Sequence, residues 1–101
     1  MKFSVITVCL NSAATIRDTI ESVLAQDHLD IEHIIVDGAS RDGTMEIVRS
    51  YGDRIAKVVS EPDRGMYDSA NKGLRLATGD VVGMLNSDDW YAAPDVLSTM
   101  A

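Results

Sequence analysis

The sequence predicts an α/β protein with a doubly wound, mostly parallel sheet, and two observations lead to this fold. Four apolar, β-branched runs of strand length alternate with three segments of helical periodicity, which gives the order βαβαβαβ. The runs are apolar at nearly every position, as in strands buried on both faces, and helical crossovers make neighbouring strands parallel. We expect the strands at residues 3–8, 31–36, 55–60 and 81–85, within a single domain that covers residues 1–101.

The first helix is expected within residues 11–27, "NSAATIRDTIESVLAQD". Asn11 and Ser12 are its candidate capping residues, because short polar side chains accept hydrogen bonds from the first free N–H groups of a helix. Its apolar residues follow one another at spacings of four, three and one, which places them in a single stripe: Ile16, Ile20, Val23 and Leu24.

The other two helices have clear start and stop signals. The second is expected to begin near Asp42 or Thr44 and to stop at Gly52, since glycine commonly follows the last helical residue. The third runs from about Met66, places small and apolar residues on one face, and ends at Gly79.

The charge of the chain argues against a polyanion-binding protein. The net charge is -7 and the nine Lys and Arg residues are scattered, whereas phosphate contacts need clustered basic residues. The N-terminal run "MKFSVITVCL" is too short to span a bilayer and leads straight into periodic structure, so we expect neither a signal peptide nor a transmembrane segment. The single cysteine, Cys9, agrees with a reducing compartment, and we expect a cytoplasmic protein.

Polar and acidic residues follow each of the expected strands. Because the carboxyl ends of parallel strands meet at one edge of a sheet, where ligands bind in such folds, these side chains should converge there. Oxygen ligands of this kind suit a hard cation such as Mg²⁺ or Mn²⁺. Asp and Asn are also common turn and cap residues, which is the alternative explanation for any single position. The residues are Asn11, Asp37, Glu61, Asp63, Asn86, Asp88 and Asp89.

Two common nucleotide signatures are missing. The segment after the first strand, "LNSAAT", contains no G-x-G-x-x-G, and the chain has no G-x-x-x-x-G-K-[ST]. A receiver-like regulatory domain with a phosphoacceptor Asp also carries acidic residues at strand ends and stays an alternative. It needs an acidic pair after the first strand and a Lys after a fifth, whereas this chain has the neutral Asn11 and no visible fifth strand.

Four segments together resemble the family 2 glycosyltransferases, enzymes of the GT-A fold that use nucleotide-diphosphate sugars. They are "FSVITVCLNSAATIRDTIESVLAQ", "EHIIVDGASRDGTMEIV", "SEPDRGMYDSANKGLRLATGD" and "VVGMLNSDDWY", and in this order they cover nearly the whole chain. The sequences "VDGASRDGT" and "SEPDRGMYDSANKG" are similar to those of the family branch associated with bacterial cell-surface polysaccharide synthesis. The resemblance implies a Rossmann-like GT-A sheet that binds a nucleotide-diphosphate sugar.

The resemblance also implies roles for residues near the first two strands. The backbone around Thr7, Val8 and Leu10 and the side chain of Asn11 are expected beside the nucleotide base and ribose. Asp37, at the end of the second strand, is expected to accept a hydrogen bond from the base or ribose.

Further donor-binding roles fall on the third segment. Many relatives have a second Asp where this chain has Gly38, which weakens the expected base contact. Asp63 is expected near the ribose or diphosphate, and Asn71 and Lys72 could face the diphosphate or sugar. A solvated surface cation is the alternative for Lys72.

The "NSDD" segment matches the family's D-x-D signature. Asn86 takes the first acidic position and, without a charge, is expected to orient the ribose or sugar by hydrogen bonds, with Ser87 beside it. Asp88 is the first choice of metal ligand. Asp89 is the competitor, since a one-residue change in how the chain leaves the fourth strand would exchange their places.

Three other residues of catalytic type are expected to be structural. His28 and His33 are far in sequence from the expected metal, and hard cations prefer oxygen to imidazole. Cys9 is expected to be a small buried apolar group, because no partner base is apparent.

In such an enzyme a divalent cation bridges the two phosphates of the donor, and a carboxylate acts as general base toward the acceptor hydroxyl. The family resemblance implies a domain of more than 200 residues with that base in its second half. We therefore expect no catalytic base within residues 1–101, which would be the donor-binding half with little transfer activity alone. The glycan or lipid-linked acceptor would be bound by the remaining part, and the inner face of the membrane is an expected location within the cytoplasm. The third alternative is a folded remnant with neither glycosyltransferase nor receiver activity.

Overall fold

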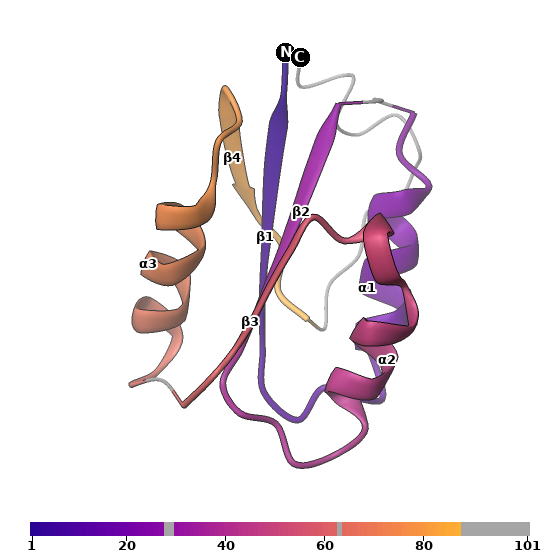
Figure 1. The fold of residues 1–101 in the computed structure, drawn as a ribbon, viewed down its shortest axis with the longest axis vertical. Coiled ribbons are helices and arrows are strands. Elements are labelled where there is room, and N and C mark those ends of the chain that lie inside the picture. The colour runs from indigo at the N-terminus through magenta and orange to yellow at the C-terminus, as the bar shows by residue number, and fades with distance from the viewer. Residues whose placement is uncertain (28–29, 63, 88–101) are drawn as a thin grey trace.

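The computed structural model describes residues 1–27, 30–62 and 64–87. Its helices and strands follow the expected order, with a short 3-10 helix added before the third strand (Figure 1). They are β1 (Phe3–Cys9), α1 (Ile16–Leu24), β2 (Ile31–Asp37), α2 (Thr44–Ser50), η1 (Gly52–Arg54), β3 (Lys57–Ser60), α3 (Met66–Leu76) and β4 (Val81–Met84). The α/β fold expected from the sequence is confirmed.

The described strands form one parallel sheet in the order β3-β2-β1-β4. β1 pairs with β2 along its whole length, as far as Cys9 opposite Asp37. β4 pairs with β1 only as far as Met84 opposite Ile6. The chain adds β2 and β3 on one side of β1 and then crosses to the other side for β4. The strand order therefore reverses between β1 and β4, which is where ligands bind in open α/β sheets.

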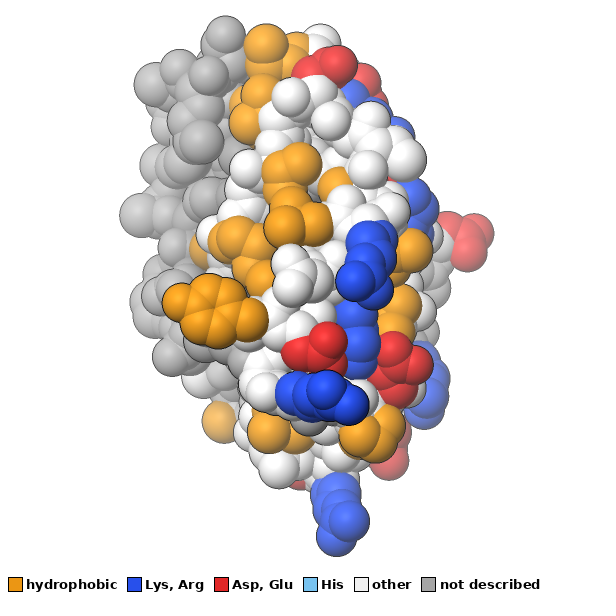
Figure 2. Space-filling view, turned by 90° about the vertical axis from the view of Figure 1, so that its left-hand side faces the viewer, with side chains coloured by type: hydrophobic (Ala, Val, Ile, Leu, Met, Phe, Trp, Pro, Cys, Tyr) orange, Lys and Arg blue, Asp and Glu red, His pale blue; other side chains and the backbone are white. Residues whose placement is uncertain are grey.

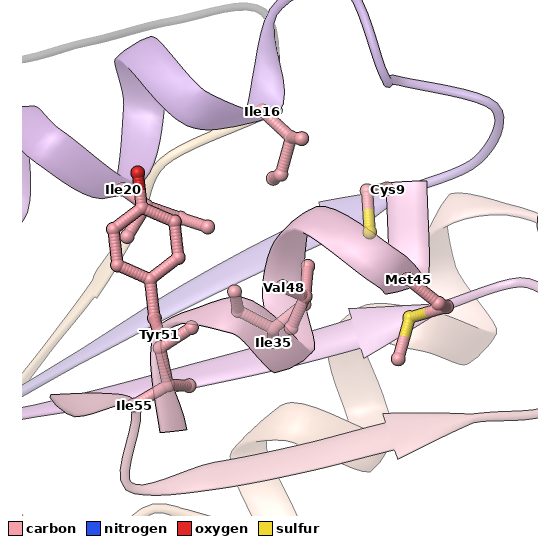
Figure 3. Packing of buried hydrophobic residues seen from close by; sticks show 8 residues of the cluster. All are labelled: Cys9, Ile16, Ile20, Ile35, Met45, Val48, Tyr51 and Ile55. Carbon is pink, nitrogen blue, oxygen red and sulfur yellow. The ribbon is translucent and has the colours of Figure 1, made fainter. Parts of the chain in front are cut away.

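Helices cover both faces of the sheet, with α1 and α2 on one face and α3 on the other (Figure 1). Between the sheet and α1 and α2, a buried cluster contains Cys9, Ile16, Ile20, Ile35, Met45, Val48, Tyr51 and Ile55 (Figure 3). On the opposite face the cluster contains Ile6, Val8, Ile34 and Val36, with Leu76 and Ala77 packed against it. This burial of apolar area on two faces stabilises the layered fold.

The expectation that every strand is buried on both faces is right for the two central strands and wrong for the outer two. Every residue of β1 is buried, whereas the residues of β3 and β4 alternate between half-buried and exposed. An outer strand has a sheet neighbour on one side only, so Val58, Val82 and Met84 keep 43%, 41% and 47% of their surface exposed. Figure 2, which views the α3 side, shows hydrophobic side chains among the charged ones on this surface.

Two elements begin later than expected. α1 begins at Ile16, because Asn11 has a φ of 50° and turns the chain instead of capping the helix. Asparagine tolerates this left-handed conformation better than most residues. β3 begins at Lys57, because η1 comes first and Ile55 packs into the cluster beneath α1 and α2.

The helix α3 lies close to β1 at Gly73. A Cβ atom at this position would be 2.5 Å from Cγ2 of Ile6, so only a residue without a side chain allows this approach. The helix ends at Leu76, before Gly79, because Ala77 is already extended. Gly73 therefore sets how closely the second half of α3 can approach the sheet.

A buried carboxylate, Glu32, ties several elements together at the amino end of the sheet. It accepts hydrogen bonds from the Ser4 hydroxyl at 3.0 Å and from the Thr78 N–H and hydroxyl at 3.0 and 2.7 Å. The ammonium groups of Lys2 and Lys57 lie 3.2 and 3.4 Å from the same carboxylate. Burial alone would raise the pKa of Glu32, but these donors outweigh it and lower the pKa to about 2.

No helix among the described residues has the length and apolar character to span a bilayer.

Candidate functional site

A pocket opens at the carboxyl edge of the sheet, where the strand order reverses between β1 and β4. Its volume is about 580 Å³, which suits a small-molecule ligand. One wall is formed by residues 8–12, 14 and 15, at the end of β1 and in the loop that follows it. Gly65 and Ser69 contribute from the start of α3, and Asn86 and Ser87 contribute from the segment after β4.

The pocket exists because β4 stops pairing before β1 ends. The last hydrogen bond between the two segments runs from the Leu85 N–H to the Ile6 carbonyl, at 2.9 Å. β1 continues to Cys9 and stays paired with β2 there. The side of β1 that faces the departing chain, around Val8 and Cys9, therefore borders the pocket.

The loop after β1 is held in place by the loop after β2. The Asn11 N–H donates to the Ser40 hydroxyl at 2.8 Å, and the Asn11 side-chain oxygen accepts from the Arg41 N–H at 2.8 Å. The Ser12 N–H donates to the Thr44 hydroxyl at 2.7 Å. The structure thus brings Asn11 to the pocket, with its side-chain oxygen already bonded.

Asp37 lies behind this loop and is fully buried. It accepts hydrogen bonds from the Ser40 N–H at 2.9 Å, the Ser60 hydroxyl at 2.8 Å, the Cys9 thiol at 3.4 Å and the Ser40 hydroxyl. Burial acts to raise the pKa of Asp37, but the hydrogen bonds from Ser40 and Ser60 lower it below its ordinary value. In this geometry the carboxylate organises the loops around the pocket, and it is not accessible as a phosphoacceptor.

Cys9, Thr7 and His33 have structural surroundings. Burial and the neighbouring Asp37 raise the pKa of the Cys9 thiol, so the thiol stays protonated at neutral pH. The Thr7 hydroxyl lies 2.8 Å from Nε2 of His33, so the Thr7 side chain bonds to the neighbouring strand β2. Burial lowers the pKa of His33 to about 4, so its ring is neutral at pH 7. The structural roles expected for Cys9 and His33 agree with these surroundings.

Lys72 and Asn71 lie on α3, and neither is among the residues that line the pocket. The Lys72 ammonium group is 3.1 Å from the Glu61 carboxylate, 3.6 Å from Asp68 and 3.3 Å from the Pro62 carbonyl. It is therefore a paired cation that links the loop before α3 to the first turns of that helix. Asn71 is exposed.

Asn86 and Ser87 both line the pocket, from the segment that follows β4. The Ser87 hydroxyl lies 2.7 Å from the Ser12 hydroxyl, and the Thr19 hydroxyl donates to the Ser87 carbonyl at 3.0 Å. Amide and hydroxyl oxygens such as those of Asn86 and Ser87 are of the type that Mg²⁺ and Mn²⁺ accept as ligands.

Some of the expected site residues lie outside the described part of the chain. Asp63, Asp88 and Asp89 belong to this group, as does His28. Within residues 1–27, 30–62 and 64–87, no group of three His, Cys, Asp or Glu side chains could hold a metal ion.

The structure brings together Val8, Leu10, Asn11, Asn86 and Ser87, all expected from the sequence, and adds residues that the sequence analysis missed. The added ones are Cys9, Ser12, Ala14, Thr15, Gly65 and Ser69. Gly65 has a φ of 115°, which favours glycine, so the glycine before the third helix was a usable signal. Ser12 was interpreted as a helix cap and is instead a pocket residue.

A parallel α/β sheet with a ligand-sized pocket at the reversal of strand order defines the class of open α/β ligand-binding domains. The sequence profile of Glycosyl transferase family 2 matches residues 4–101. The chain belongs to this family, and the GT-A fold expected from the resemblance is confirmed.

Relatives and solved structures agree with the family. The chain is 44% identical, over 89 residues, to the Bacillus subtilis glycosyltransferase TuaG, whose name assigns it provisionally to teichuronic acid biosynthesis. This match covers 85% of the chain and 35% of TuaG. The chain likewise spans only 37% and 40% of the length of two mycobacterial glycosyltransferases to which it is 38% and 33% identical.

Two solved structures are similar to the fold described above. The mannosyltransferase PcManGT from Pyrobaculum calidifontis, in complex with GDP-Man and Mn²⁺, has a TM-score of 0.88 and 32% identity. That match covers 96% of this chain and 30% of PcManGT. Staphylococcus aureus TarS 1-349, in complex with UDP-GlcNAc, has a TM-score of 0.89 and 30% identity, and the match covers 99% of this chain and 30% of TarS 1-349.

Proposed function

We propose that the chain is the N-terminal, donor-binding half of a glycosyltransferase that transfers a sugar from a nucleotide-diphosphate sugar to an acceptor hydroxyl in surface polysaccharide or glycan synthesis. The observation that carries the proposal is the pocket at the reversal of strand order, one wall of which is the start of the "NSDD" segment. The nucleotide sugars in the two similar structures support it. A receiver-like role is not favoured, because Asp37 is fully buried and bonded.

The pocket residues would bind the donor in two groups. The backbone of Val8 and Leu10 and the side chain of Asn11 would contact the base and ribose, while Asn86 and Ser87 would contact the ribose or sugar. Thr7 would contribute through the β1 backbone, since its side chain bonds to His33. Asp37 was expected to accept a hydrogen bond from the base or ribose; since its carboxylate is buried, it would support this contact by fixing the loops around the pocket. These assignments are testable one residue at a time.

The remaining assignments concern the diphosphate. Asp88, with Asp89 as competitor, would hold a divalent cation, Mg²⁺ or Mn²⁺, which when bound offsets the negative charge that grows on the leaving diphosphate. Asp63 would lie near the ribose or diphosphate. Lys72 and Asn71 would have to reach the diphosphate or sugar from α3, and for Lys72 this would break the ion pair with Glu61.

The acceptor site and the general base would come from the part of the parent protein beyond residue 101. We accordingly propose that the 101 residues bind donor but transfer little or no sugar. The proposed compartment is the cytoplasm, with a glycan or lipid-linked acceptor presented at the inner face of the membrane. Robust transfer by the isolated 101 residues would overturn the proposed position of the base.

Calorimetric titration with nucleotide-diphosphate sugars, with and without Mn²⁺, tests donor binding. The panel includes GDP-Man and UDP-GlcNAc, the donors held by the two similar structures. We expect binding of at least one donor that Mn²⁺ strengthens at least tenfold, about 1.4 kcal/mol. Phosphorylation of Asp37 by a small phosphodonor, without metal-dependent donor binding, would overturn the proposal in favour of a receiver-like domain.

Three substitutions locate the metal. Asp88→Ala is expected to abolish the Mn²⁺ effect, and Asp89→Ala to preserve part of it. Asp53→Ala is the control, because Asp53 is an exposed carboxylate in η1. Loss of the effect in Asp89→Ala alone would exchange the two roles, and no loss in either variant would place the metal elsewhere.

A further inference from the structure

The pocket is open because the chain turns away from β1 after Leu85. Along β1, the residues from Thr7 to Cys9 have no partner in β4, since the register of that pair stops at Ile6 opposite Met84. Within the part of the chain that the structure describes, this stretch of the β1 edge has no strand beside it, and such an edge favours pairing with a nearby extended segment through its N–H and C=O groups. Residues 86 and 87 do not pair with β1 in this way, so other contacts must hold them apart from it.

Two hydroxyl groups hold Ser87 on the α1 side of the sheet. The Thr19 hydroxyl, from the middle of α1, donates to the Ser87 carbonyl at 3.0 Å. The Ser12 hydroxyl lies 2.7 Å from the Ser87 hydroxyl. Both the backbone and the side chain of Ser87 are thus fixed, one by the helix and the other by the loop before it.

These two contacts rest on well-fixed groups. Thr19 is fully buried, so packing around α1 fixes the hydroxyl that donates to the Ser87 carbonyl. Ser12 is held through its N–H, which donates to the Thr44 hydroxyl at 2.7 Å, and through its carbonyl, which accepts from the Ile16 N–H at 2.9 Å. The anchor for Ser87 is therefore the packed layer of α1 and α2, not a free loop.

We propose that Thr19 is a positioning residue that, together with Ser12, keeps the donor pocket open by holding Ser87 away from the edge of β1. Thr19 acts through Ser87 and does not need to touch the donor. The role rests on the proposed function, since an open pocket matters only if a nucleotide ligand occupies it.

Paired substitutions separate the hydroxyl from the shape of the side chain. Thr19→Val removes the hydroxyl and keeps the branched shape, while Thr19→Ser keeps the hydroxyl. Ser12→Ala removes the second contact. Ser22→Ala is the matched control, because Ser22 is on the same helix and its hydroxyl donates to the Thr19 carbonyl at 2.8 Å, within the helix.

The first measurement is amide hydrogen exchange by NMR at residues 85–87, without any ligand. We expect Thr19→Val and Ser12→Ala to change exchange there by about fivefold or more, the usual weight of one hydrogen bond, and Thr19→Ser and Ser22→Ala to resemble the unchanged chain. Unchanged exchange in Thr19→Val would overturn the proposal that Thr19 holds Ser87 in place. This result does not depend on what the pocket binds.

The second measurement is the Kd for UDP and for GDP with Mn²⁺, by calorimetry on the same proteins, with the unfolding midpoint recorded for each. We expect Thr19→Val to weaken binding about five- to tenfold and Thr19→Ser to restore it. A lower midpoint with an unchanged Kd would show a merely structural role and overturn the inference. If the unchanged chain binds neither nucleotide, the proposed function is overturned. The exchange data then decide by themselves whether Thr19 holds Ser87 in place.

Discussion

The Ser60 hydroxyl donates to the Asp37 carboxylate at 2.8 Å, so the end of β3 is tied to the end of β2 directly behind the pocket. The same carboxylate accepts from Ser40, which in turn accepts from Asn11 at the pocket wall. A buried acidic group thereby connects the loops that follow three neighbouring strands.

Ser60→Ala is expected to destabilise the chain by about 1 kcal/mol, because the charged Asp37 loses one of its donors. Ser50→Ala is the matched control, since the Ser50 hydroxyl is exposed and bonds within its own helix. Urea unfolding of both variants measures the difference. Equal midpoints would show that Asp37 does not depend on Ser60.

Because of Glu32, we expect the free energy of unfolding to fall at acidic pH. Its pKa is lowered from 4.5 to about 2 in the folded chain, so the unfolded chain binds the proton first as the pH falls. The stabilisation is present above pH 4.5 and is lost as the pH falls toward about 2. Urea unfolding at a series of pH values should therefore show a steeper decline for the unchanged chain than for Glu32→Gln. The exposed Glu46→Gln is the control, and parallel curves for all three proteins would contradict the prediction.

His33 is expected to act in a separate pH window. Burial lowers its pKa from 6.5 to about 4, so only the unfolded chain is protonated between these values. The free energy of unfolding should fall as the pH decreases from 6.5 to about 4. NMR titration of the His33 ring measures the pKa directly, and a value near 6.5 would show that the ring is not buried as described.

Gly73→Ala is expected to destabilise the chain by about 1–3 kcal/mol, the usual cost of overpacking a core. The added Cβ would lie 2.5 Å from Cγ2 of Ile6, and either α3 or the Ile6 side chain must move. Asn71→Ala, at an exposed position of the same helix, should be neutral or slightly stabilising. Thermal unfolding compares the two variants, and a neutral Gly73→Ala would mean that α3 lies farther from the sheet.

Lys72→Met decides between the two roles for this residue. Loss of the partly exposed ion pairs with Glu61 and Asp68 should change stability by no more than about 1 kcal/mol. If Lys72 keeps these partners, the Kd for UDP or GDP with Mn²⁺ should change less than about threefold. A tenfold weaker Kd, with stability preserved, would instead show a direct contact with the diphosphate.

Much of the fold could be predicted from local sequence patterns. The apolar runs located β1 and β2 almost to the residue, since strands buried on both faces leave little room for polar side chains. The same reasoning overestimated the burial of β3 and β4, whose place at the outside of the sheet is decided by the order of pairing. A run such as "VVGM" looks the same in sequence whether it becomes a central or an outer strand.

The sequence by itself determined the α/β class, the family resemblance and the strand ends that border the pocket, because these depend on residue type and spacing along the chain. Only the tertiary structure decided how the side chains at those ends are used. Asp37 turns inward to Ser40 and Ser60, Lys72 pairs with Glu61, and Ser12 meets Ser87 at the pocket wall. These partners are between 3 and 75 residues apart, and hydrogen bonds of about 3 Å form only where packing has already placed both groups.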